Sequence, residues 1–379
     1  MSKSPKAEVV LYLGAGASHF AGYKTFVDFP SLLFDNNLRE LEGMPNLSKN
    51  PERILCAIKE SLVRNNTPTT HDNFLWRLDG YNQFLRLNQC DDALQDFLRN
   101  SNRLYDLHIC TQQAIQQITA TTIHHYSLNR VEKAKRSYNL LYQSMKRVYS
   151  IYSAIAELNG NKPFLPVFTT NYDMLIEDLH AEFCDQSKHS FSLVNGIPGL
   201  FDEEAKWNTD VYNKRIMSGI HLYRLHGCVC WFYHQPGDSH IYFHRRNATE
   251  QETVRMRAMY PGNQSEIGSP PYGHAFIKFY RYLQVCKLII FVGFSFRDDD
   301  VMHVLLKALE ERKGKLKLLI IDPLYRSHDV VRKLEDAAQR TMFPYYFPKD
   351  SEIESITMPF GQSEDTDSKI VEACKRILI

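Results

Sequence analysis

The stretch that decides the fold lies near the N-terminus and reads Val9-Val10-Leu11-Tyr12-Leu13-Gly14-Ala15-Gly16-Ala17-Ser18. Its first half, residues 9–13, is apolar and uncharged, which is typical of a parallel strand that is covered on both faces. Gly14 and Gly16 then let the backbone turn tightly and approach a phosphate group, which main-chain amides and the positive end of a following helix can hold. The stretch therefore predicts one half of a nucleotide site.

The glycine turn does not complete the general dinucleotide-binding fingerprint. That fingerprint has a third glycine, and the position where it would stand is occupied by His19. A glycine turn of this kind is weak evidence by itself, so its meaning depends on the rest of the chain.

Three later segments have the same organisation, in which a strand runs into a polar or glycine turn. They are Val167-Phe168-Thr169-Thr170-Asn171-Tyr172-Asp173, Leu222-Tyr223-Arg224-Leu225-His226-Gly227 and Leu288-Ile289-Ile290-Phe291-Val292-Gly293-Phe294-Ser295-Phe296. Each places its polar groups at the carboxyl end of a strand, which is where open parallel sheets bind ligands. We therefore expect the four turns to gather at one edge of one sheet.

The alternation of strands and helices after Pro163 predicts an α/β fold with a doubly wound, Rossmann-like parallel sheet. Strands are expected at 164–168, 221–225, 286–292 and 316–321, and helices at 173–181, 298–311 and 329–339. The segment 228–244 is expected to form a two-stranded ribbon with a turn at 235–238. At 379 residues with 44% hydrophobic content, the chain exceeds the usual size of one domain.

Residues 31–160 have little strand signal and predict a large α-helical insertion. Apolar residues recur at three- and four-residue steps in two places, namely Tyr138, Leu141, Met145, Val148, Tyr152 and Ile155, and less strictly Leu104, Leu107, Ala114, Ile115 and Ile118. We expect these two faces to pack on each other inside one lobe, with subunit contacts as the alternative. The predicted domains are thus 1–30 with 161–379, and 31–160.

The four turns together resemble the sirtuin-like family, whose members bind NAD through a Gly-Ala-Gly-x-Ser loop, an Asn-x-Asp turn, a His-Gly turn and a Gly-x-Ser turn. The resemblance frames most of residues 1–30 and 160–345 and does not cover the stretch between them. It implies NAD as the substrate, and a sirtuin-like version of the sheet described above.

Two departures separate the chain from the protein deacetylases of that family. Those enzymes carry a zinc module made of two Cys-x-x-Cys pairs, whereas this sequence contains no such pair and has Cys228-Val229-Cys230 instead, followed by His234, His240 and His244. Two thiols at alternate positions of a strand are poorly placed to bind one tetrahedral zinc ion, so we expect buried thiols and no zinc. The deacetylase segment Gly-x-Pro-Asp-Phe-Arg is replaced by Gly22-Tyr23-Lys24-Thr25-Phe26-Val27.

Thr170-Asn171-Tyr172-Asp173 resembles the form found in bacterial sirtuin-like NAD-cleaving effectors of anti-phage defence. This branch implies an NAD+ glycohydrolase that depletes NAD during abortive infection. Its members are often controlled by oligomerisation or by a partner such as a HerA-type ATPase, so we expect a homo-oligomer and a partner in trans. An NAD- or ADP-ribose-binding sensor or scaffold without turnover is the alternative, and an NAD-dependent protein deacylase is less favoured.

The resemblance assigns candidate catalytic roles to Asn171 and His226. The Asn171 amide can donate and accept hydrogen bonds at a ribose hydroxyl or a water, and a histidine with a pKa near neutrality can take a proton from such a group. A plain turn asparagine and a buried strand-end histidine are the structural alternatives.

Further residues are expected to bind NAD. The phosphates are assigned to the amides of Gly14, Ala15, Gly16 and Ala17 with the Ser18 hydroxyl, and the adenosine ribose or pyrophosphate to Gly293 and Ser295. Thr170 belongs to the asparagine turn. Asp173 is expected either to orient the nicotinamide carboxamide or to cap a helix, and Asp322 either to accept from a ribose diol or to form an Asp-Pro turn. Asp298, Asp299 and Asp300 are expected to cap and charge a helix, with no metal site.

Charge and cysteine usage limit the partners and the compartment. With 45 basic and 44 acidic residues the formal net charge is +1, so no overall field attracts nucleic acid to this chain alone. The eight cysteines, at positions 56, 90, 110, 184, 228, 230, 286 and 374, form no framework of short spacings and predict reduced thiols. The start has too short an apolar run for a signal peptide or membrane span, which predicts a cytoplasmic protein.

Overall fold

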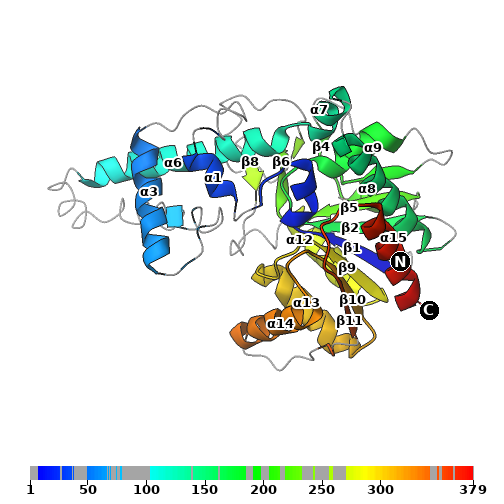
Figure 1. Cartoon of the computed structure of the whole chain (residues 1–379). Helices are drawn as coiled ribbons and strands as arrows, with labels where there is room; N and C mark the ends of the chain where they lie inside the picture. The colour runs from blue at the N-terminus through cyan, green and yellow to red at the C-terminus, as the bar shows by residue number, and fades with distance from the viewer. Residues whose placement is uncertain are drawn as a thin grey trace. The chain divides into compact units, whose positions relative to one another are not determined.

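The computed structural model of the chain is drawn in Figure 1. The residues that it describes are 7–25, 28–35, 37, 49–65, 67, 69, 74, 77–78, 103–137, 140–160, 163–184, 191–197, 205–213, 218–232, 242–243, 256–258, 270–341, 348–349, 352–361 and 363–378. They form two compact units, the first comprising 1–23, 129–246 and 257–379, and the second 24–128 and 247–256.

The first unit is built on a seven-stranded sheet in which every pairing is parallel. Its order is β11-β10-β9-β1-β2-β5-β3. The strands are β1 (Val9–Leu13), β2 (Phe164–Thr169), β3 (Ser192–Val194), β5 (Gly219–Arg224), β9 (Leu288–Val292), β10 (Lys317–Ile321) and β11 (Ile353–Ile356). Because later strands continue outward on both sides of β1, the predicted doubly wound parallel sheet is confirmed. Its topological switch point lies between β1 and β9.

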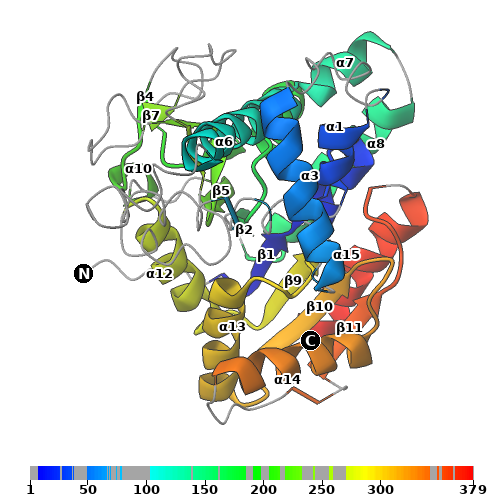
Figure 2. The same cartoon turned by 90° about the vertical axis from the view of Figure 1, so that its left-hand side faces the viewer.

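Helices cover both faces of this sheet, as Figure 1 shows. One face carries α8 (Leu140–Glu157), α9 (Leu175–Phe183) and α15 (Glu364–Leu378), and the other carries α12 (Tyr272–Leu283), α13 (Asp299–Arg312) and α14 (Ser327–Thr341). Figure 2 shows α13 and α14 beside β9, β10 and β11. The short helices α7 (Arg130–Arg136) and α10 (Asp210–Asn213) complete this unit.

The central strands are buried along their whole length, which explains their uncharged sequences. Aromatic side chains fill the space beneath the site. The ring of Tyr12 lies 5.2 Å from that of Phe291, 4.7 Å from that of Phe294 and 5.7 Å from that of Phe279. These centroid distances are those of favourable aromatic pairs, so the strand ends rest on a closely packed base.

A second, four-stranded sheet has the order β4-β7-β6-β8. Its strands are β4 (Ala205–Lys206), β6 (Gly227–Phe232), β7 (Tyr242–Phe243) and β8 (Met256–Ala258). The antiparallel pairing of β6 with β7 confirms the predicted ribbon. The turn predicted at 235–238 lies outside the described residues.

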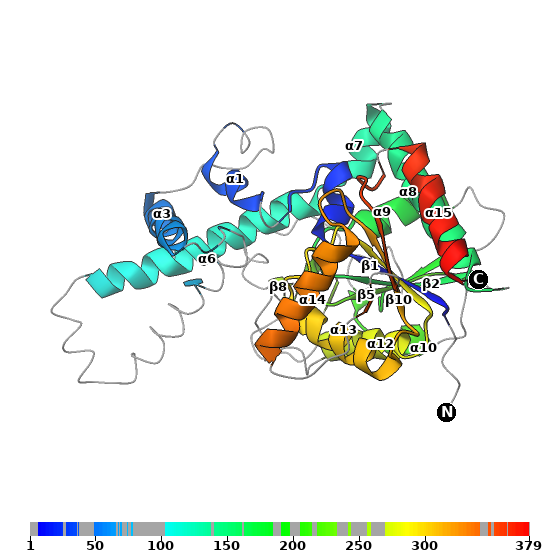
Figure 3. The same ribbon diagram turned by 60° about the horizontal axis from the view of Figure 1, so that its bottom comes forward.

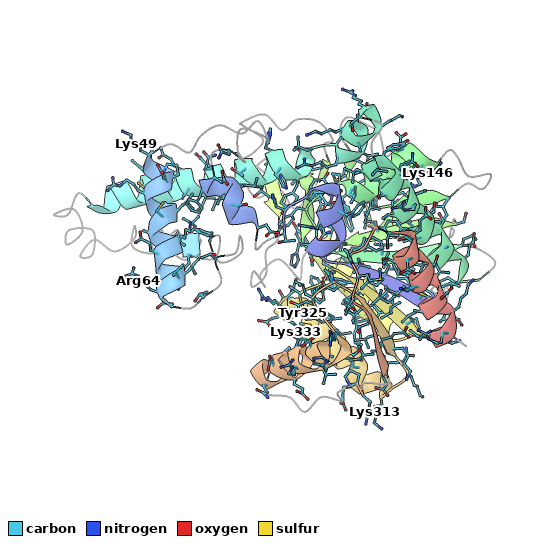
Figure 4. All side chains as sticks on the ribbon, viewed as in Figure 1. Lys49, Arg64, Lys146, Lys313, Tyr325 and Lys333 are labelled. Atoms are coloured by element: carbon cyan, nitrogen blue, oxygen red, sulfur yellow. The ribbon has the colours of Figure 1, made fainter. Side chains whose placement is uncertain are left out.

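The second unit is helical. It contains α1 (Phe29–Phe34), α3 (Lys49–Arg64) and α6 (Arg103–Ser127), and both α1 and α3 contact α6 (Figure 3). Figure 4 marks the ends of α3 by Lys49 and Arg64. The buried positions in α6 include Ala114 and Ile118, as the weaker of the two periodicities predicts.

The stronger periodicity belongs to α8, which is part of the first unit. Met145, Val148, Tyr152 and Ile155 are buried, and α8 packs on β2, α9 and α15. Tyr138 lies outside the described residues. The expectation that this face packs on the earlier helix therefore differs from the structure, because an amphipathic pattern predicts a buried face without naming what covers it. The domain boundaries at 30 and 160 stay a prediction.

Among the described helices, none combines the length and apolar character that a membrane crossing requires. The seven described cysteines are all free thiols.

Candidate functional site

The turns after β1 and β9 interlock at the switch point. Gly14 N donates to Val292 O at 2.9 Å, and Gly16 N donates to Gly293 O at 3.0 Å. A Cβ on Gly14 would stand 2.5 Å from Gly293 O, and one on Gly293 would stand 2.4 Å from Ala17 N. Gly293 also has a φ of +58°, in the left-handed region. These glycines are therefore required for one turn to pack directly on the other.

This interlock changes the expectation for the phosphate-binding amides. Ala17 N donates to Gly14 O at 2.9 Å inside the turn of 3₁₀ helix at Ala15–Ala21, so three of the four assigned amides already have main-chain acceptors. An amide that donates to a carbonyl must exchange that bond before it can hold a phosphate. The structure does bring Gly14, Ala15, Gly16 and Ala17 to the switch point, and their contact with NAD stays a prediction.

Ser18 joins two turns of the site. Its Oγ accepts a hydrogen bond from Asn171 Nδ2 at 3.1 Å, and its hydroxyl donates to the Asp173 carboxylate. All three side chains are buried. The expected phosphate contact of Ser18 stays a prediction, but the structure gives this hydroxyl a second and internal role.

Asp173 lies at the start of α9, where its Oδ1 accepts from Leu175 N at 3.0 Å. This bond forms a turn just before the helix, whose N-cap residue is Met174 and has no side-chain cap, so the capping role of Asp173 stays a prediction. Burial raises the pKa of Asp173, while the nearby Arg224 and the hydrogen bonds from Leu175 N and Ser18 act in the opposite direction. A contact with nicotinamide stays a prediction.

The two polar atoms of the Asn171 side-chain amide differ in their hydrogen bonding. Its backbone N donates to Thr169 Oγ1 at 3.0 Å, and its Nδ2 is occupied by Ser18. Its Oδ1 is buried and has no hydrogen-bond partner within the part of the chain that the structure describes. A buried acceptor of this kind costs free energy unless a ligand or water donates to it. The catalytic role of Asn171 stays a prediction.

Arg224 is a site residue that sequence reasoning missed. Its guanidinium is buried, with Nη1 donating to Asn171 O and Nη2 to Asp173 O, each at 2.9 Å. Nη2 also lies 2.6 Å from Glu177 Oε2 in a buried ion pair. Arg224 thereby fixes the backbone of the asparagine turn. The available signal was a charged residue inside the otherwise apolar run Leu222-Tyr223-Arg224-Leu225.

His226 contacts Asp298, a second relationship that the sequence did not predict. His226 Nε2 lies 2.9 Å from Asp298 Oδ2, and both side chains are buried. Asp298 Oδ1 accepts from Val301 N at 3.2 Å, which confirms the predicted cap of α13. Gly227 has a φ of +77°, which lets the chain leave β5 and enter β6 directly after the histidine.

Tyr12 and Thr170 lie beside this histidine–aspartate pair. The Tyr12 hydroxyl donates a long hydrogen bond of 3.5 Å to Thr170 Oγ1. Burial, and then the charge of Asp298, raise the pKa of Tyr12 well above its ordinary value, so the phenol stays neutral. The structure thus places Thr170 next to the predicted catalytic residues, and its contact with NAD stays a prediction.

The turn after β9 contains a backbone outlier. Phe296 has a φ of +56° although it carries a large side chain, and its ring is buried 5.2 Å from Phe291 and 4.8 Å from Phe294. Such conformations cost about 1–3 kcal/mol and persist where the surrounding packing holds them. In the same turn Ser295 is exposed and Gly293 is half-buried. The roles of Ser295 and Gly293 in binding stay predictions.

Asp322 ends β10 in a turn. Its Oδ1 accepts from Leu324 N at 2.8 Å, which is the turn alternative from the sequence. Burial raises its pKa, and the positive charge of Lys333 partly offsets that effect. Lys333 Nζ lies 4.6 Å from the centre of the Tyr325 ring, and Figure 4 labels both side chains. A ribose contact for Asp322 stays a prediction.

Cys228 and Cys230 are buried on β6. A hydrogen bond with Cys228, and then burial, raise the pKa of the Cys230 thiol well above its ordinary value. The described residues contain no group of three or more histidine, cysteine or acidic side chains that could hold a metal ion. His234, His240 and His244 lie outside the described residues.

Residues 166–341 match the family model of the SIR2-like domain. The fold is sirtuin-like. The matched segment contains the asparagine, His-Gly and Gly-x-Ser turns, and the glycine turn after β1 precedes it. Asn171, Asp173, Arg224, His226 and Asp298 all lie within the match.

Comparison with solved structures found two Sir2 homologue complexes with ADP-ribose, one a histidine-to-asparagine mutant and the other a phenylalanine-to-alanine mutant. The first has a TM-score of 0.40 and the second 0.39, each at 11% sequence identity. Each alignment covers 98% of this chain and 92% of the other. A search of curated protein sequences found no match.

Proposed function

We propose that this chain is an NAD+ glycohydrolase that cleaves NAD to nicotinamide and ADP-ribose. The observation that carries the proposal is the buried and unpartnered Oδ1 of Asn171, at the carboxyl edge of a sirtuin-like sheet in the part of the chain that the structure describes. No donor among the described residues reaches Oδ1, so it is available to a group that enters the site. A ribose hydroxyl or an attacking water supplies such a donor.

The reaction breaks the bond between C1′ of the ribose and the nicotinamide nitrogen. The bonding electrons leave with nicotinamide, which becomes neutral, and positive charge develops on the sugar. A water oxygen then bonds to C1′ and its proton passes to a base. The protein must hold the ribose, exclude bulk water and position the nucleophile, as in other reactions with oxocarbenium-like transition states.

Asn171 and His226 have the chemistry for these steps. Asn171 holds the ribose hydroxyl or the attacking water through Oδ1, and Arg224 fixes the asparagine backbone through Asn171 O. His226 accepts a proton from the same class of group. The glycine turns after β1 and β9 provide the closely packed edge at which the dinucleotide phosphates would lie.

The resemblance to bacterial defence effectors supports a biological extension of the proposal. In this role the enzyme depletes NAD during phage infection, as a homo-oligomer restrained or activated by a HerA-type ATPase in trans. Expression of the chain with and without a HerA-type ATPase in infected bacteria, with cellular NAD measured over time, tests this role. NAD loss that needs both infection and an intact Asn171 supports it, and unchanged NAD contradicts it.

The enzymatic test is direct. Purified chain is incubated with NAD, alone and with the ATPase, and nicotinamide and ADP-ribose are separated by chromatography. Asn171→Ala and His226→Ala should abolish release, whereas the exposed Asn208→Ala and His303→Ala should not. Nicotinamide release that depends on an acetylated peptide would instead indicate a deacylase. NAD binding with no release in either condition would indicate a sensor.

A further inference from the structure

The contact between His226 and Asp298 joins two turns that are far apart in the sequence. His226 follows β5, and Asp298 precedes α13 directly after the Gly-x-Ser turn of β9. His226 Nε2 and Asp298 Oδ2 are 2.9 Å apart, and the two side chains are only 1% and 7% exposed. In such a shielded place a carboxylate contact constrains an imidazole far more than it does at the surface.

Asp298 is itself held in place. Its Oδ1 accepts from Val301 N, and its extended backbone, with φ −78° and ψ 104°, is that of a helix cap. The charge of Asp298, after burial, also raises the pKa of Tyr12 on β1, so that phenol stays protonated. One oxygen of Asp298 is thus anchored to the helix while the other lies against the histidine.

We propose that Asp298 is a positioning residue for His226. Its carboxylate keeps the imidazole proton on Nε2 and stabilises the imidazolium that forms when His226 takes a proton. This is the role that the aspartate has in hydrolytic triads, where it sets the tautomer and orientation of the histidine without being protonated itself. The expected effect of Asp298 on kcat rests on the proposed NAD hydrolysis, whereas the expected tautomer of His226 does not depend on it.

The position of Asp298 at the N-terminus of α13 favours a carboxylate that accepts from the ring over an acid that donates to it. A carboxylate near a helix N-terminus is stabilised by the helix dipole and by the amide that it accepts from. An ionised carboxylate only accepts hydrogen bonds, so a hydrogen bond between the two groups requires the proton on His226 Nε2. Asp298 therefore links the start of α13 to the protonation of His226.

The test uses Asp298→Asn, with Asp299→Asn as the matched control. Both substitutions remove one negative charge from the same helix start. Asparagine caps helices about as well as aspartate, so α13 and the thermal unfolding temperature should be preserved. The side-chain nitrogen that Asp298→Asn introduces would be a donor toward His226, which would favour the tautomer with the proton on Nδ1.

The first readout is long-range ¹H–¹⁵N NMR of the full chain labelled at its 15 histidines. The His226 signals are identified by their loss in His226→Gln. We expect the Nε2-protonated tautomer in the wild type and in Asp299→Asn, and a shift toward the Nδ1-protonated tautomer in Asp298→Asn. An Nδ1-protonated His226 in the wild type would overturn the proposal without any variant.

The second readout is NAD hydrolysis. Asp298→Asn should lower kcat by up to about 10⁴-fold, the size of loss seen when a triad histidine loses its orienting carboxylate, with KM changed much less. Asp299→Asn should retain wild-type kcat. Failure of the glycohydrolase proposal would appear as an inactive wild type, and the NMR result would still decide the tautomer. Equal kcat in Asp298→Asn and the wild type would overturn the kinetic part of the proposal.

Discussion

Asn171 Nδ2 lies 3.1 Å from Ser18 Oγ, although 153 positions separate the two residues in the chain. The contact ties the turn after β2 to the turn after β1, and it leaves the other atom of the Asn171 amide to face the site.

Ser18→Ala should weaken both folding and catalysis. The substitution removes the acceptor of Asn171 Nδ2 and a donor to Asp173, which leaves two buried polar groups unsatisfied. We expect the free energy of unfolding to fall by about 1–3 kcal/mol, and NAD hydrolysis to fall by at least about tenfold as the Asn171 amide loses its orientation. Urea titration and initial rates measure the two effects. Ser150→Ala on the exposed face of α8 is the control, and an equal loss there would argue against the role of Ser18.

Gly293→Ala should disrupt the interlock of the two glycine turns. The new Cβ would collide with Ala17 N and the residue would keep a positive φ, so the unfolding free energy should drop by about 2–4 kcal/mol. Gly160→Ala also places alanine at an unfavourable positive φ of +104°, but no atom among the described residues lies within 4 Å of the new Cβ. It should cost about 1 kcal/mol. Equal losses in the two variants would show that steric contact between the turns is not limiting.

Removing Arg224 should be more damaging than removing the whole buried ion pair. Arg224→Met leaves Glu177 buried without its partner and frees the carbonyls of Asn171 and Asp173, which should cost about 3–5 kcal/mol of unfolding free energy. Arg224→Met combined with Glu177→Gln should recover part of that loss. A double-mutant cycle in urea measures the coupling. Strict additivity of the two substitutions would contradict the pairing.

Asp173 should make the folded protein less stable as the pH rises above the acidic range. Burial raises its folded-state pKa above the ordinary value of 3.8, so the folded chain holds this proton more tightly than the unfolded chain. The Asp173 contribution is therefore fully present below pH 3.8 and is lost as the pH rises to the folded pKa. The difference in unfolding free energy between the wild type and Asp173→Asn should therefore shrink as the pH rises through this window. A difference that does not change with pH would mean that another group is responsible.

The sequence predicted the sheet well because its signal is local. An uncharged apolar run such as residues 9–13 predicts a buried strand from its own residues alone. The glycine turn after it is likewise predicted from adjacent residues. The same holds for the cap that Asp298 gives to α13, since its acceptor and donor are three positions apart.

The missed features are pairings between distant segments. Nothing in the run around Arg224 indicates that Glu177 lies opposite it, and nothing near His226 indicates Asp298, because sheet order decides which turns meet. The burial of the α8 face was predictable from periodicity, but its packing partners were not. For Asp173 and Asp322 the sequence left two roles open, and in the fold each carboxylate accepts from the amide two positions later, which is a local turn bond.

The two bonds from Gly14 and Gly16 into the turn of β9 extend the hydrogen-bonded ladder of the central strands beyond their ends. The base of the candidate site, formed by the glycine turns after β1 and β9, is thus continuous with the hydrogen bonding of the central strands. Opening that base would require β1 to separate from β9, so its amides should exchange hydrogen with solvent as slowly as those of the core strands. Under the proposed function, this edge should therefore stay fixed while NAD enters and leaves.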